Sequence, residues 1–140
     1  MTLRLILLVL ILLTGCSDKS ELAVDSLSLQ DVEEKLNGNW RINLIETKER
    51  KWIPHSSKYT IEYFELSGLK GINGHVIYNK DGSIATKTHQ PQCELKEKNG
   101  SKVIEFIGLS DWTEMTIVKL SDSEMILSDS TNTVTYIREK

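Results

Sequence analysis

The chain has 140 residues, with 17 lysines and arginines against 20 aspartates and glutamates, which gives a formal net charge of −3 at pH 7. A mildly acidic chain with interspersed charges lacks the basic patch that binds nucleic acid or an anionic lipid surface. We therefore expect no nucleic-acid partner, and the length suits one domain with a single core.

The N-terminus has the order of a secretory signal peptide. Arg4 provides a positive charge, residues 5–13 are all apolar, and Thr14 and Gly15 stand directly before Cys16. The apolar run is shorter than the roughly 20 residues that span a bilayer.

The ending Leu13-Thr14-Gly15-Cys16 resembles the lipobox of bacterial lipoproteins. The resemblance implies that residues 1–15 are removed and that Cys16 is acylated, so that the acyl chains hold the protein on a membrane. Ser17 follows the cysteine, where aspartate would favour the inner membrane of Gram-negative bacteria. The implied location is the bacterial cell envelope and, where two membranes exist, the periplasmic face of the outer membrane rather than the inner membrane.

The chain divides into a signal peptide (residues 1–15), a lipidated tether (residues 16–27) and one domain (residues 28–140). With Cys16 acylated, Cys93 has no disulfide partner. A lone thiol in an oxidising compartment is normally buried, so we expect Cys93 to be inert rather than a nucleophile.

The domain opens with a short helix. Ser28 is a suitable N-cap with Asp31 three positions later, and apolar residues recur at helical spacing until Asn37-Gly38. The pattern predicts a helix over Leu29–Leu36.

After Gly38 the apolar period changes to two, which is typical of half-buried strands. Turn signals such as Asp81-Gly82 and Asn99-Gly100 separate the β-prone runs. Pro91 requires a bend, bulge or edge in the long fourth run. Eight strands are predicted, at residues 40–44, 59–63, 72–79, 83–96, 103–108, 112–120, 125–128 and 133–138.

The short loops favour an antiparallel meander. A meander of eight strands has two exposed edges unless it closes. The predicted fold is therefore all-β: an eight-stranded antiparallel up-and-down barrel, with the N-terminal helix plugging one end.

Two stretches carry a family resemblance. Gly38-Asn39-Trp40 is similar to the Gly-x-Trp opening of lipocalin-like domains, and Tyr136-Ile137-Arg138 is similar to the last strand of bacterial lipocalin-like lipoproteins. The resemblance implies a calycin barrel in which Arg138 lies across Trp40, as a cation–π pair at the closed end.

The barrel interior is the candidate binding site. Tyr63, Tyr78, Phe106, Met115 and Tyr136 are the tentative ligand-binding residues. An eight-stranded barrel either holds one small ligand or is filled by its own side chains, and both alternatives stay open here. The inward positions predicted from alternation are Trp40, Ile42, Leu44, Ile61, Tyr63, Val76, Tyr78, Ile104, Phe106, Met115, Ile117, Leu127, Val134 and Tyr136.

Catalytic chemistry has little support. His55, His75 and His89 are far apart and lack metal-ligand spacing, and no nucleophile–base arrangement is visible. We expect no catalytic residue, no metal and no cofactor.

The sequence thus predicts a membrane-anchored envelope lipoprotein, not an enzyme, whose barrel binds a small hydrophobic or amphipathic ligand. The alternative is a solid barrel that binds an envelope protein or inhibits a hydrolase.

Overall fold

The computed structural model describes residues 22–89, 91–108 and 114–140. Its helices are η1 (Val24–Ser26), α1 (Leu29–Leu36) and η2 (His55–Lys58). Its strands are β1 (Gly38–Thr47), β2 (Lys51–Trp52), β3 (Thr60–Ser67), β4 (Lys70–Tyr78), β5 (Ile84–Lys87), β6 (Gln92–Lys98), β7 (Ser101–Ile107), β8 (Glu114–Leu120), β9 (Glu124–Ser128) and β10 (Asn132–Arg138).

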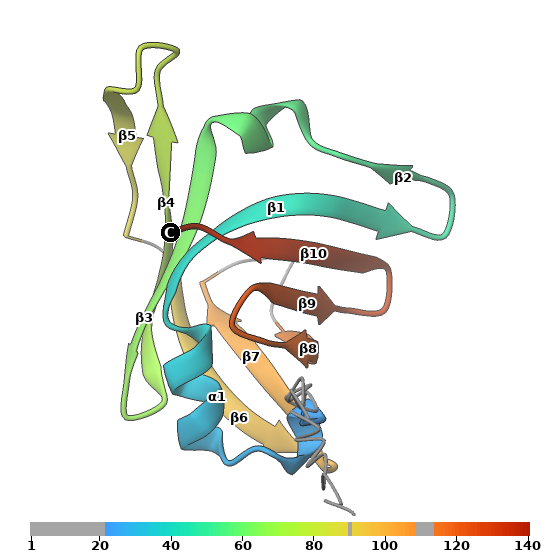
Figure 1. Cartoon of the computed structure of the whole chain (residues 1–140). Helices are drawn as coiled ribbons and strands as arrows, with labels where there is room; N and C mark the ends of the chain where they lie inside the picture. The colour runs from blue at the N-terminus through green and yellow to red at the C-terminus, as the bar shows by residue number, and fades with distance from the viewer. Residues whose placement is uncertain (1–21, 90, 109–113) are drawn as a thin grey trace, which may run out of the picture.

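The strands form one antiparallel sheet that closes on itself (Figure 1). Around the barrel the order is β1-β3-β4-β6-β7-β8-β9-β10, and β10 pairs again with β1. Closure satisfies the edge groups that an open sheet would expose. The predicted eight-stranded closed barrel is confirmed.

Helix α1 covers one end of the barrel. Ser28 and Asp31 form the expected capping box, because each side chain bonds the backbone N–H of the other. The apolar face of the helix places Val32 and Leu36 in the barrel core, where both are fully buried. The indole Nε1 of Trp40 donates to the carbonyl oxygen of Leu36 at 2.8 Å, so the first strand is tied to the helix that precedes it.

The seam between β1 and β3 is short. Only Gly38–Trp40 of β1 pairs with β3, and the last of these pairs joins Trp40 to Glu62. From Ile45 onward, this edge of β1 pairs with β2 instead. Figure 1 shows β3 and β1 diverging from the helix end, with η2 and β2 in the connection between them. We call the end covered by α1 the closed end and the opposite end the mouth.

The structure corrects two strand predictions. The long strand predicted at residues 83–96 is two strands, β5 and β6, which pair with different halves of β4 on either side of Pro91. Strand β2 was not predicted, because two residues are too few to show a period. The first two residues of the predicted strand 112–120 lie outside the described residues.

The tether boundary also changes. Residues 1–21, including Cys16, lie outside the described residues. Val24, which we expected in the tether, is instead buried within η1, which contacts β7 and β8 at the closed end. The folded domain therefore begins before Ser28, since an apolar side chain in the supposed tether completes the core.

A bulge in β1 changes which residues face the core. Ile42 pairs with Tyr136 and Leu44 pairs with Thr135, so Asn43 has no partner and the alternation shifts by one residue. Ile45 packs against the core in the place where alternation predicted Leu44. The alternation of apolar and polar residues before Asn43 is regular, so the sequence pattern does not predict this bulge.

Candidate functional site

The barrel interior changes character between its two ends. Near α1 it is a dry core, in which five large inward side chains are at most 2% exposed: Trp40, Phe64, Ile104, Leu120 and Met125. Toward the mouth, Ile42, Ile45 and Glu62 are only partly buried, although strand register points them inward. Solvent therefore reaches the inner wall that β1 and β3 form above Trp40.

The inner wall of β3 and β4 is polar. Phe64 and Leu66 lie in the core, so the alternating position Glu62 also faces inward, and its partners across the sheet are Trp40 on β1 and His75 on β4. Directly opposed residues on one face of an antiparallel pair have Cβ atoms about 5 Å apart. A carboxyl group and an imidazole thus lie side by side within the barrel.

Glu62 meets Tyr136 across the interior. Tyr136 on β10 is 4% exposed and makes a side-chain hydrogen bond with the Glu62 carboxyl. Desolvation raises the pKa of Glu62 to about 7, and the bond from Tyr136 only partly offsets this shift. Burial and the nearby carboxylate raise the pKa of Tyr136 well above its usual value, so the phenol stays a donor.

The polar pair shares the barrel interior with apolar side chains. The side chains of Phe106, Met115, Leu127 and Val134 all belong to the buried cluster and are at most 7% exposed. A carboxyl and a phenol among apolar side chains is the usual composition of a site for a small amphipathic molecule.

The five tentative ligand-binding residues divide between the two faces of the sheet. Phe106, Met115 and Tyr136 lie in the buried cluster of the interior. The inward placement of Tyr63 and Tyr78 is wrong, because β3 and β4 present the opposite alternation to the core. The same one-residue offset moves the predicted inward positions Ile61 and Val76 to the outer face, where both stay partly buried.

Tyr63 is buried on the outer face instead. Its ring lies against Gly74 of β4, where a Cβ atom would collide with the phenol oxygen. The hydroxyl donates to the carbonyl oxygen of Thr88 and lies 2.8 Å from Nδ1 of His89. The chain after β5 thus covers an outward apolar side chain, which is why alternation alone assigns it to the wrong face.

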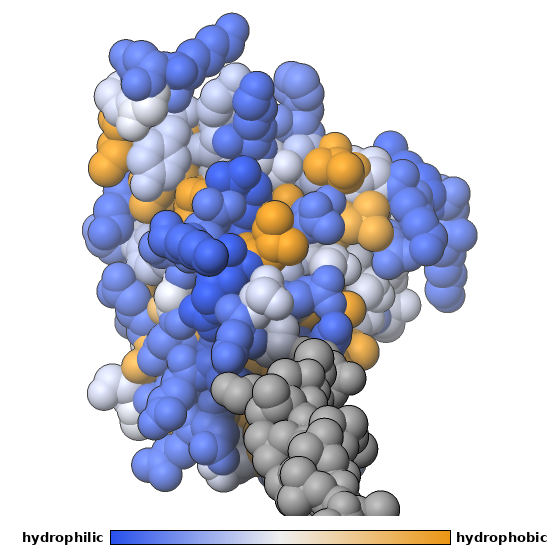
Figure 2. Space-filling view, in the orientation of Figure 1, coloured by the Kyte–Doolittle hydropathy of each residue, from blue (hydrophilic) through white to orange (hydrophobic). Residues whose placement is uncertain are grey.

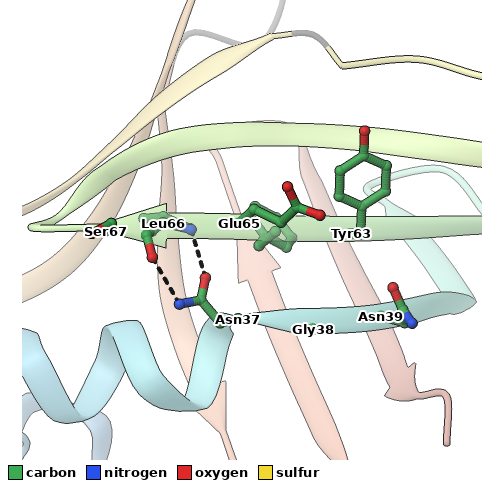
Figure 3. Close-up of a pocket in the computed structure, with 8 residues that line it drawn as sticks. Asn37, Gly38, Asn39, Tyr63, Glu65, Leu66 and Ser67 are labelled. Atoms are coloured by element: carbon green, nitrogen blue, oxygen red, sulfur yellow. Dashed lines mark hydrogen bonds between the residues drawn. The ribbon is translucent and has the colours of Figure 1, made fainter.

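A surface groove of about 430 Å³ follows the outer side of the β1–β3 seam. Figure 3 shows the Asn37 side chain at one end of this groove, bonded twice to the backbone of Leu66, and the Tyr63 ring at the other. The Asn37 amide donates to the carbonyl oxygen at 3.0 Å and accepts from the N–H at 2.7 Å. These two hydrogen bonds join the C-terminus of α1 to β3, so Asn37 in this groove has a structural role.

A second outer groove, of about 400 Å³, is lined by cationic and aromatic side chains that include Arg41, Lys58 and Tyr78. Nε of Arg41 lies 2.8 Å from a carboxylate oxygen of Glu139, so a neighbouring acid pairs with the arginine. The buried Nε of Arg41 thus has its ion-pair partner in the lining of the same groove.

At the closed end, the Arg138 guanidinium carbon lies 4.1 Å from the centroid of the Trp40 ring. The guanidinium also donates to the carbonyl oxygens of Lys35 and Asn37 at the C-terminus of α1. Arg138 therefore serves the helix, strand β1 and the ring at once, which is a structural function.

Cys93 is poorly suited to act as a nucleophile in this geometry. Cys93 is a free thiol, 1% exposed, and burial raises its pKa to about 11, so the reactive thiolate is scarce. Within residues 22–89, 91–108 and 114–140, no group of three His, Cys, Asp or Glu side chains could hold a metal ion. In the same ranges, no helix is long and apolar enough to cross a bilayer.

Comparison with known proteins bears on the fold alone. No protein-family model and no curated protein matches the chain. Among solved structures, a lipocalin-like protein from Bacteroides uniformis aligns with a TM-score of 0.51 and 13% identity, over 75% of this chain and 99% of its own. The fold is lipocalin-like. An uncharacterized protein from Bacteroides eggerthii aligns over 74% of this chain and 99% of its own, with a TM-score of 0.51 and 12% identity.

The lipocalin-like barrel should show the cost of its interior carboxyl in its pH dependence. Glu62 binds a proton up to about pH 7 when folded and up to about 4.5 when unfolded, so its contribution to stability falls as the pH rises through this window. When the pH is raised from 4.5 to 8, the unfolding free energy of Glu62→Gln should increase by about 1–3 kcal/mol relative to that of the wild type. Urea denaturation at both pH values measures this gain.

Glu65→Gln is the matched control, because Glu65 is the exposed carboxylate on the outer face of the same strand. It should follow the wild-type profile. If the unfolding free energies of the wild type and Glu62→Gln change with pH in the same way, the Glu62 carboxyl is not desolvated.

Proposed function

We propose that this lipocalin-like barrel binds a small amphipathic molecule at a bacterial envelope, where acyl chains on Cys16 anchor it. One observation carries the binding part: Glu62 and Tyr136 form a polar pair inside the barrel, on a wall that solvent reaches. The fold itself supports a binding role over a catalytic one, although one fold can host many functions.

The polar pair has no structural need that explains it. Placing a carboxyl group in a barrel costs free energy unless hydrogen bonds or a counter-charge compensate, and an apolar side chain of similar size would avoid this cost. The interior next to α1 is apolar and dry, so the barrel does not depend on Glu62 for closure. A ligand whose polar head meets Glu62 and Tyr136 would account for the pair.

The apolar side chains of the interior support the other half of the ligand. Phe106, Met115 and Leu127 supply aromatic, thioether and aliphatic side chains to the same interior. A tail of a few methylenes placed there would gain about 0.8 kcal/mol for each buried methylene. Head and tail would then contact different side chains of the same interior.

The anchor proposal rests on the sequence before the described residues. The lipobox-like Leu13-Thr14-Gly15-Cys16 supports acylation, and Ser17 supports the outer membrane where there are two. The described chain begins at the closed end of the barrel, in η1, opposite the mouth (Figure 1). This arrangement favours a mouth that faces away from the anchor.

The alternative function, a barrel that binds another protein through its surface, gains less support. Among the described residues, no two exposed large apolar side chains share a helix or strand; these are Leu22, Ile53, Ile84, Ile107, Val118 and Ile137. On the face in Figure 2, hydrophilic residues separate the apolar ones, whereas a docking surface usually has a continuous apolar centre.

Acylation should depend on Cys16 alone. In a bacterial host fed an alkyne analogue of palmitate, the full chain should become labelled, and Cys16→Ser should remove the label. Cys93→Ser is the control and should keep it, because Cys93 is 1% exposed in the folded barrel. Labelling that survives Cys16→Ser would contradict the anchor.

Ligand binding can be tested with decanol, a neutral amphiphile, and the full chain carrying Cys16→Ser. Calorimetric titration should show saturable binding. Ile45→Trp should weaken it by about tenfold or more, because Ile45 faces inward near the mouth and a larger ring there would fill the space.

Leu44→Trp is the control for this titration, since the bulge turns Leu44 to the outer face. It should bind decanol like the parent chain. Absence of saturable binding, or equal affinities for the parent and Ile45→Trp, would contradict a ligand site in the barrel.

A further inference from the structure

The charges inside the barrel are unequally compensated. Lys102, 3% exposed, has its ammonium 2.6 Å from a carboxylate oxygen of Glu97. Arg138 gives its NH groups to two carbonyl oxygens of the helix end. Glu62 has a hydrogen bond from Tyr136 and, among the described residues, no cation within ion-pair distance.

The strands around Glu62 supply no permanent counter-charge. On β10, Tyr136 is a neutral donor. Arg138, also on β10, pairs with Trp40 of β1, and Trp40 in turn pairs with Glu62, so the neutral Trp40 stands between the two charged residues. On β4, His75 lies opposite Glu62, with its Nδ1 3.0 Å from Oγ1 of Thr88. Phe106 and Met115, which belong to the buried cluster of the interior, carry no charge.

A carboxylate accepts up to about four hydrogen bonds through its two oxygens, and one donor leaves most of that capacity free. Any ligand head group placed beside the Glu62 carboxyl must supply donors of its own, or leave a desolvated charge behind.

We propose that Glu62 selects the ligand by its head group: the barrel prefers an amphiphile with a cationic, ammonium-type head over one with a carboxylate head. The inference rests on the proposed function, because it concerns the same interior site. An ammonium head carries three N–H donors and the compensating charge, whereas a fatty-acid anion would bring a second negative charge beside Glu62.

The protonation of Glu62 gives the selection a pH dependence. Because desolvation raises the pKa of Glu62 to about 7, the group is mostly ionised at pH 8 and mostly protonated at pH 5.5. Binding of an alkylammonium ion near neutral pH would release the Glu62 proton to solvent and leave an ammonium–carboxylate pair. A fatty-acid anion would require the protonated carboxyl, which can donate a hydrogen bond to it.

The test compares decylamine, decanoate and decanol, which share one tail length and differ in the head. Calorimetric titration of the full chain carrying Cys16→Ser is done at pH 8 and pH 5.5. At pH 8, decylamine should bind about tenfold or more tightly than decanol, and decanoate more weakly than decanol. At pH 5.5 the preference for decylamine should shrink and decanoate should gain affinity.

Glu62→Gln, which keeps the shape of the side chain, should give the three amphiphiles affinities within about threefold of one another at pH 8. Glu65→Gln should behave like the parent. The pH comparison in the parent chain tests the proposal even where Glu62→Gln is poorly folded.

The outcomes separate this inference from the proposed function. Saturable decanol binding without a preference for decylamine at pH 8 overturns head-group selection and leaves the ligand site in place. A preference for decylamine that persists in Glu62→Gln also overturns it. Failure of all three amphiphiles to bind overturns the proposed function itself.

Discussion

The barrel depends on the junction that Gly38–Trp40 makes at the start of β1. These residues pair with β3 on one side, while β1 pairs with β10 on the other, so they close the sheet where the strands meet. Gly38 has a φ of +127°, and a Cβ atom there would lie 2.6 Å from an Arg138 nitrogen, so only glycine admits the guanidinium. The same guanidinium covers Trp40 and holds the helix end.

This junction divides the interior into two regions. On the α1 side, Val32, Leu36 and Trp40 fill the barrel without measurable exposure. On the other side, β1 and β3 separate above the Trp40–Glu62 pair, and partly exposed side chains line the inner wall. A dry core at one end thus borders a partly exposed, polar wall at the other, and the proposed ligand site follows from where the seam ends.

Sequence patterns predicted the local structure well, because the signals are local. The capping box at Ser28 and Asp31 predicted the helix, and the turn dipeptides predicted the antiparallel order of the strands. The faces of β3 and β4 were not predictable in this way. Tyr59, Ile61 and Tyr63 alternate as a core face would, yet Tyr59 and Ile61 line an outer groove, and the chain after β5 covers Tyr63.

The candidate site escaped sequence analysis for the same reason. Glu62 and His75 look like solvent-facing positions between apolar residues, and only the pairing of three strands shows that both face inward. Tyr136 was predicted inside, but its partner lies 74 positions earlier in the chain. An inward polar residue is indistinguishable from an outward one until the register is known.

The central claim is that the Glu62 carboxyl is desolvated inside the barrel and lies where a ligand's head group binds. Carbon-13 NMR of the glutamate side-chain carboxyls, titrated with and without decylamine, measures this directly. We predict one resonance, absent from Glu62→Gln, that titrates near pH 7 and shifts to a lower pKa when decylamine is bound. If every glutamate titrates in the ordinary range, or if decylamine leaves that resonance unchanged, the account is contradicted.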